Sequence, residues 1–268
     1  DAFEEPHTPA ITISATSPNV TLGNEYYFRV CFMEDFQGAA LATYAAQELG
    51  ATKAAIIYEI TNDTCVGVRA SLVETFVSLG GEMVGEASFS VGDQDFNSQI
   101  MAVMAGEPEV IFIPGNYTEA ALCISQARAL GYDTSFMGTD IIDVPAFLEV
   151  GGSDVNGTVT STYFDPAAPT TDVGEKFMEA YSSTYDDSPS ALSALGFDAY
   201  LAAIRAIEAA GTTDGPAVKD ALYALEMDGA TGALRFDDNG DAIKNQVVLK
   251  VAQDGEYVYY DTVEVNLE

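Results

Sequence analysis

Positive charge and histidine are scarce in this 268-residue sequence. Lys and Arg number 10 against 42 Asp and Glu, which gives a formal charge of −32 at pH 7, and His7 is the single histidine. A surface this negative repels phosphate backbones and anionic lipid headgroups, so no nucleic acid partner is expected. Because there is one histidine and no G-x-S-x-G turn, nucleophilic hydrolysis is not expected either.

Cysteine is equally sparse. Cys31, Cys65 and Cys123 lie at wide, unrelated spacings, without a C-x-x-C pair or a Cys/His cluster. We therefore expect no zinc site, and an odd number of cysteines cannot form a closed disulfide framework. All three are expected to be buried as small apolar residues.

Long apolar runs are also lacking, since Gly, Pro or charged residues interrupt each of them, and no segment is expected to span a membrane. The first residues, DAFEEPHTP, have no signal-peptide character, so we expect any export signal to have been removed.

Strand and helix patterns alternate through much of the chain. The apolar segments 54–59, 81–90, 109–115 and 134–140 are each followed by a helical pattern, near 66–79, 95–106, 117–131 and 144–151. This alternation predicts an α/β fold with parallel strands and helices on both faces of the sheet. Beyond 157–166 we expect three helices, near 172–185, 191–210 and 216–226, and then an antiparallel hairpin that turns at Asp254-Gly255.

Polar loops follow the apolar run ITI at 11–13, which predicts a further strand, and three of the strands above, at 14–17, 62–65, 115–117 and 139–140. In parallel sheets ligands lie outside the carboxyl ends of the strands. Asp140 is therefore a candidate to hold a ligand ammonium, or else a helix cap, for which Asp143 is better placed. Tyr117 either packs on a ligand or only opens its helix. Asp63 is expected to cap a helix.

The segment FDDNGD, at 236–241, lacks the alternate acidic spacing and the following Glu of an EF-hand, so we expect a turn. Neither a metal nor another cofactor is expected.

Six segments in order resemble a known family: SATSP, FRVCFMEDFQGAALATYAAQELG, AAIIYE followed by DTCVG, GNYTEA followed by QARALG, FMGTD, and ALGFDAYLAAIRAIEAAG. The chain resembles the type I solute-binding proteins of ABC importers, in the branched-chain amino-acid (Leu/Ile/Val) group. The resemblance implies a two-lobed α/β fold. Residues 1–33 and 164–243 would form lobe one, and residues 34–163 and 244–268 would form lobe two.

Members of that family begin with three further βα units, about 90 residues at about 30 per unit, that are not in this sequence. The resemblance therefore implies an incomplete first lobe. On this basis we expect the 268-residue chain alone to bind amino acids weakly or not at all and to self-associate through an uncovered surface.

The family's ligand contacts are carried over by position. The resemblance implies that Ser14, Ala15 and Thr16 form a loop that holds the ligand carboxylate, that Asp140 holds the α-ammonium, and that Tyr117 contacts the ligand. Thr64 and Leu192 stand where the family often has aromatic residues. These smaller side chains would leave room for a ligand at least as large as leucine, including an aromatic one, or for a ligand with water beside it.

The resemblance implies an extracytoplasmic protein, in the periplasm or at the cell surface as a lipoprotein. It would capture an amino acid between two closing lobes and deliver it to an ABC transporter permease. An alternative is the ligand-sensing domain of a signalling receptor for amino acids or amides, because one fold serves both roles. An enzyme is not expected, since the sequence shows no nucleophile–base pair and no metal cluster.

Overall fold

The computed structural model describes residues 7–265, which divide into two compact units. Unit 1 consists of residues 7–33 and Tyr163–Asn245, and unit 2 of Glu34–Thr162 and residues 246–265. The chain therefore passes from one unit to the other three times. The correspondence of these units with the two lobes of the resembling family stays a prediction.

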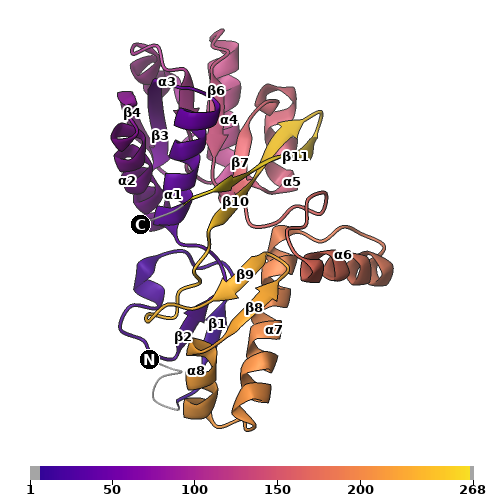
Figure 1. The fold of residues 1–268 in the computed structure, drawn as a ribbon. Helices are drawn as coiled ribbons and strands as arrows, with labels where there is room; N and C mark the ends of the chain where they lie inside the picture. The colour runs from indigo at the N-terminus through magenta and orange to yellow at the C-terminus, as the bar shows by residue number, and fades with distance from the viewer. Residues whose placement is uncertain (1–6, 266–268) are drawn as a thin grey trace. The chain divides into compact units, whose positions relative to one another are not determined.

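A seven-stranded sheet forms the centre of unit 2, in the order β11-β10-β7-β6-β5-β3-β4 (Figure 1). The strands β4, β3, β5, β6 and β7 run parallel, whereas β10 pairs antiparallel with β7 and with β11. Their bounds are β3 Lys53–Glu59, β4 Glu82–Phe89, β5 Val110–Phe112, β6 Ser135–Gly138, β7 Val159–Thr162, β10 Gln246–Gln253 and β11 Glu256–Glu264.

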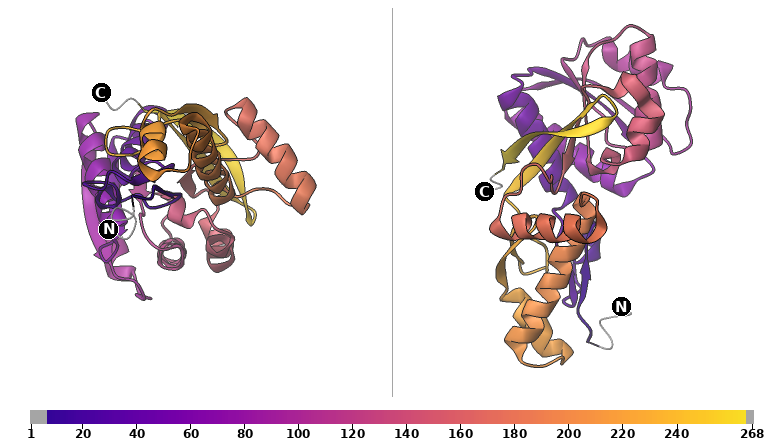
Figure 2. Two further views of the ribbon diagram at one scale, coloured as in Figure 1. Left: turned by 90° about the horizontal axis from the view of Figure 1, so that it is seen from below. Right: turned by 90° about the vertical axis from the view of Figure 1, so that its right-hand side faces the viewer.

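Helices cover both faces of this sheet, as the right-hand view of Figure 2 shows. They are α1 Glu34–Thr43, α2 Asp63–Ser78, α3 Asn97–Met104, α4 Tyr117–Ala129 and α5 Pro145–Gly151. Successive residues of a strand point to opposite faces, so one strand feeds two cores. Ile111 of β5 belongs to the core under α3, α4 and α5, while its neighbour Phe112 makes an edge contact with Phe76 of α2 on the other face.

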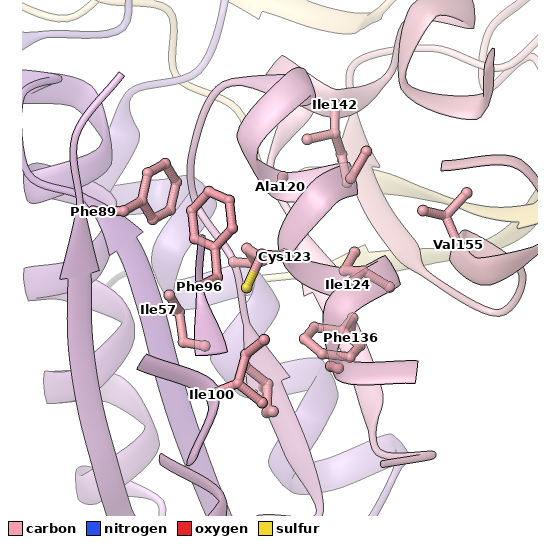
Figure 3. Close-up of a cluster of buried hydrophobic side chains, with 14 of the residues drawn as sticks. Ile57, Phe89, Phe96, Ile100, Ala120, Cys123, Ile124, Phe136, Ile142 and Val155 are labelled. Carbon is pink, nitrogen blue, oxygen red and sulfur yellow. The ribbon is translucent and has the colours of Figure 1, made fainter. Parts of the chain in front are cut away.

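The core under α3, α4 and α5 contains one of the cysteines. Figure 3 shows the Cys123 side chain among Phe96, Ile57 and Ile100. Burial raises the pKa of this thiol to about 12. All three cysteines are buried, which confirms the expectation from sequence.

The hairpin between β10 and β11 forms at the predicted dipeptide. Asp254 and Gly255 connect the two strands with φ angles of 52° and 86°. Two consecutive positive φ angles are those of a type I′ turn, whose twist matches that of the paired strands.

Unit 1 contains two small sheets within its described residues. In one, β1 (Ala10–Thr12) and β2 (Tyr27–Arg29) run parallel, and in the other β8 (Glu226–Gly229) and β9 (Gly232–Arg235) run antiparallel. The helices are α6 Asp172–Tyr185, α7 Ala191–Ala210 and α8 Gly215–Tyr223. A groove of about 680 Å³ is lined by Ile11 of β1 together with apolar side chains of α7 and α8, but self-association through such a surface stays a prediction.

One predicted helix boundary in unit 1 was wrong. The helix expected near 216–226 ends at Tyr223, and β8 begins at Glu226. The reason is the fully buried Asp198 of α7, whose carboxylate accepts hydrogen bonds from the backbone N–H of Ala230, at 2.5 Å, and of Thr231, at 2.9 Å. These bonds fix the turn between β8 and β9, so this segment pairs as a hairpin.

Candidate ligand-binding site

Three of the predicted site residues follow parallel strands of unit 2 at the same edge of the sheet. Thr64 is the second residue of α2, after β3; Tyr117 is the first residue of α4, after β5; and Asp140 follows β6. Since the carboxyl ends of parallel strands share one edge, these side chains belong to one rim, the edge at which ligands bind in such sheets.

Two asparagines, one on each loop, start the helices at this edge. The Asn62 side chain accepts a hydrogen bond from the Thr64 N–H at 3.0 Å, and the Asn116 side chain accepts one from the Thr118 N–H at 3.1 Å. The sequence prediction of Asp63 as a cap was therefore wrong, because Asn62 caps α2 and Asp63 is its first residue.

A buried carboxylate ties these two loops together. Glu59, the last residue of β3, accepts hydrogen bonds from the Asn116 N–H and from the Thr61 hydroxyl, both at 3.0 Å. Tyr117 is the first residue of α4, which agrees with one of the two roles that the sequence suggested for it. Its half-buried ring packs against the core of unit 2. Contact of Tyr117 with a ligand stays a prediction.

The Asp140 carboxylate is held by a side chain that the sequence analysis missed. Gln37 of α1 is completely buried, and its Nε2 donates to Asp140 Oδ1 at 2.6 Å and to Ser161 Oγ at 2.9 Å. A sequence signal exists, because Gln37 interrupts the apolar pattern of FQGAALA. Its partners lie 103 and 124 residues away, so the sequence does not reveal them.

Asp143 has a different role from the cap that the sequence predicted. Val144 is the N-cap of α5, without a side-chain hydrogen bond. Asp143 Oδ2 instead accepts from the Thr162 hydroxyl at 2.6 Å and from Lys250 Nζ at 3.2 Å. The capping prediction was wrong because this ion pair with β10, 107 residues away, takes the carboxylate.

The rim of unit 2 is electrically negative near Asp140. Burial and the negative charges of Glu59, Asp140 and Glu34 raise the pKa of the Cys65 thiol to about 12. Gln37 donates a hydrogen bond that orients the Asp140 carboxylate, and Lys250 forms an ion pair with Asp143. A cationic group is the ligand chemistry that this electrostatic environment favours.

In unit 1 the loop after β1 carries the other predicted contacts. Ser14 is exposed and Thr16 is buried. The carbonyl oxygen of Ala15 accepts a hydrogen bond from Arg29 Nη1 at 2.7 Å, and the buried Arg29 also donates to Asp241 and Thr21. A buried ion pair thus fixes the backbone of this loop.

The remaining predicted wall residue, Leu192, is the second residue of α7 and is 51% exposed. Its contact with a ligand, like that of Thr64 and of residues 14–16, stays a prediction. Between residues 7 and 265 no group of three or more His, Cys, Asp or Glu side chains could hold a metal ion. No helix in the same range combines the length and the hydropathy that a membrane span requires.

The family assignment comes from a match over nearly the whole sequence. The model of the periplasmic binding protein family matches residues 1–256. The chain belongs to this family. This periplasmic binding protein is also similar to the solved structure of the leucine-binding protein LivK from Thermotoga maritima MSB8, with 36% sequence identity and a TM-score of 0.91. The match covers 98% of this chain and 75% of that chain, and it confirms the predicted type I fold.

Two further proteins to which the chain is similar are also named as binding proteins for amino acids. The solved structure of LivJ from Streptococcus pneumoniae, in complex with isoleucine, is 25% identical with a TM-score of 0.87, over 98% of this chain and 74% of that chain. The leucine-, isoleucine-, valine-, threonine- and alanine-binding protein of Pseudomonas aeruginosa is 26% identical over 248 residues. This periplasmic binding protein is matched there over 91% of its own length and spans 65% of the relative's length.

Proposed function

We propose that this periplasmic binding protein recognises an amino acid with an apolar side chain, outside the cytoplasm, and presents it to the permease of an ABC transporter. Asp140 binds the α-ammonium of that amino acid. The protein catalyses no reaction. It functions by binding the ligand more tightly in one conformational state than in another, so that the ligand shifts the equilibrium between them.

The observation that carries this proposal is the oriented carboxylate of Asp140, directly after β6. The amide nitrogen of the buried Gln37 donates a hydrogen bond to Asp140 Oδ1 at 2.6 Å. Asp140 is also only partly buried, next to other negative groups. A carboxylate that is oriented, negative and accessible is suited to an ammonium, with which it forms a charge-assisted hydrogen bond.

The names of the relatives support the same class of ligand. The T. maritima protein is a leucine-binding protein, and the S. pneumoniae structure contains isoleucine. Thr64 and Leu192, where aromatic residues are common in the family, favour a ligand at least as large as leucine.

The test is Asp140→Asn in the whole gene product, with leucine binding measured by calorimetry. The substitution keeps the shape of the side chain and removes its charge, so the ammonium loses its partner and affinity should fall about 30-fold or more. Asp133→Asn is the matched control, because Asp133 precedes the same strand and its side chain is fully exposed. We expect the control to bind like the wild type. Equal affinity of Asp140→Asn and wild type would overturn the proposed role of Asp140.

A further inference from the structure

We infer that Gln37 is a positioning residue for ligand recognition, which acts on the ligand ammonium through Asp140. This inference rests on the proposed function. It assigns a role to the one polar side chain in a buried stretch of α1 that contains Phe36, Ala39, Ala40 and Leu41.

The chemistry of its partners fixes the orientation of the Gln37 amide. An ionised carboxylate can only accept hydrogen bonds, so the NH₂ group of the amide must face Asp140. The same nitrogen donates to Ser161 Oγ at 2.9 Å, and the Ser161 hydroxyl can donate onward to the Gly138 carbonyl at 3.5 Å. Both protons of the amide are thus used, one on the carboxylate and one on β7, the strand next to β6.

This arrangement fixes Asp140 from two directions. The backbone of Asp140 begins the 3-10 turn Asp140–Ile142 at the end of β6, and its Oδ1 is held at 2.6 Å by Gln37. A carboxylate held in one rotamer loses less conformational freedom when a cation binds, so it binds that cation more tightly.

Gln37 is an unfavourable choice if stability alone is considered. Its Oε1 is buried and has no hydrogen-bond partner among the described residues, and an unsatisfied buried acceptor costs free energy. An apolar side chain at position 37 would avoid that cost. The amide therefore has its use in orienting Asp140.

The experiment is a double-mutant cycle on the whole gene product. Gln37→Met keeps the length of the side chain and removes both donors, and leucine affinity is measured in the wild-type and in the Asp140→Asn background, at millimolar ligand in the latter. Loss of positioning should weaken leucine binding about tenfold in the wild-type background and less than twofold beside Asp140→Asn, because no carboxylate remains to be oriented. Gln47→Leu, at an exposed position of the following turn, is the control and should leave the affinity unchanged.

A second ligand separates positioning from general damage. 4-Methylpentanoate has the carboxylate and side chain of leucine without the ammonium, so Gln37→Met should leave its binding, measured by competition, within twofold of wild type. Equal losses for both ligands, or in both backgrounds, would overturn the role of Gln37 and leave the proposed function intact. Failure of the wild type to bind any amino acid would overturn the proposed function, and this inference with it. Should Gln37→Met not fold, Gln37→Ala removes the amide without adding volume and repeats both comparisons.

Discussion

Single buried polar residues set the geometry of the loops in this protein. Arg29 is fully buried in unit 1 and connects three segments, through Asp241, Thr21 and the carbonyl of Ala15. An isolated buried charge is costly, so each member of this group depends on the others. The same logic applies in unit 2 to Asp143 and Lys250.

Arg29→Met should therefore destabilise unit 1 by about 3–5 kcal/mol, because the buried Asp241 carboxylate loses its cation. Urea unfolding, followed by circular dichroism, measures this loss. Arg205→Met is the matched control, since Arg205 lies in the same unit, has a side chain that is 59% exposed and pairs with Glu208 on its own helix. That exposed pair should contribute less than about 1 kcal/mol. Similar small effects of the two substitutions would show that the Arg29 group does not stabilise the fold.

At the scale of helices and strands, most of the fold could be predicted from the sequence. The helices expected at 172–185 and 191–210 have those bounds in the structure, because Thr171 and Ser190 cap them locally and their apolar faces repeat with helical spacing. The hairpin at Asp254-Gly255 was equally visible, since its turn type depends on two adjacent residues. These features are determined by neighbours in the sequence.

The candidate site could be predicted only in part from the sequence, because its buried polar residues depend on partners far away in the chain. The loops at the carboxyl ends of the strands could be found, but Gln37 and Arg29 could not, because Ser161 lies 124 residues from the first and Asp241 lies 212 residues from the second. The role of Asp143 was predicted wrongly for the same reason. Its place before a helix favours a capping role, whereas in the structure it pairs with Lys250, 107 residues away. Tertiary partners decide the role of a buried polar side chain, and a single sequence does not name them.

The packing of α1 on α2 depends on a glycine. A Cβ on Gly38 would lie 2.6 Å from the backbone oxygen of Val68 and 2.9 Å from the backbone nitrogen of Leu72. Backbone atoms of a packed helix do not move away cheaply, so the two helices approach this closely only because residue 38 has no side chain. The approach also determines where α1 places Gln37, the preceding residue.

Gly38→Ala should lower the free energy of unfolding by about 1–3 kcal/mol through overpacking, although alanine is the better helix former by about 1 kcal/mol. Gly196→Ala in α7 is the control, because a Cβ there would meet nothing within 4 Å. The control should stabilise the protein by about 0.4–1 kcal/mol. Thermal and urea unfolding of both variants measure the two changes. A Gly38→Ala protein at least as stable as wild type would mean that α1 can shift on α2 without loss.

At the scale of the whole molecule, the dominant feature is its charge. The sequence has 10 basic residues against 42 acidic ones, so there are too few basic side chains to pair with most of the carboxylates. Two units with separate cores need not unfold together, so the midpoint of each unfolding transition is the quantity to follow. Repulsion among the carboxylates opposes the compact state and is reduced by salt.

The molecule should accordingly become more stable as salt rises. Between 0.01 M and 1 M salt the screening length falls from about 30 Å to about 3 Å, which removes most of the repulsion between exposed carboxylates. Exposed pairs such as Arg205 with Glu208 weaken too, but pairs of this kind contribute only about 0–1 kcal/mol each, so the net effect should be a higher urea midpoint. Sodium, potassium and tetramethylammonium chloride at equal ionic strength should act alike if screening is the cause. A midpoint that falls with salt, or that rises with only one of the three cations, would show that repulsion among the carboxylates is not what limits the stability of this protein.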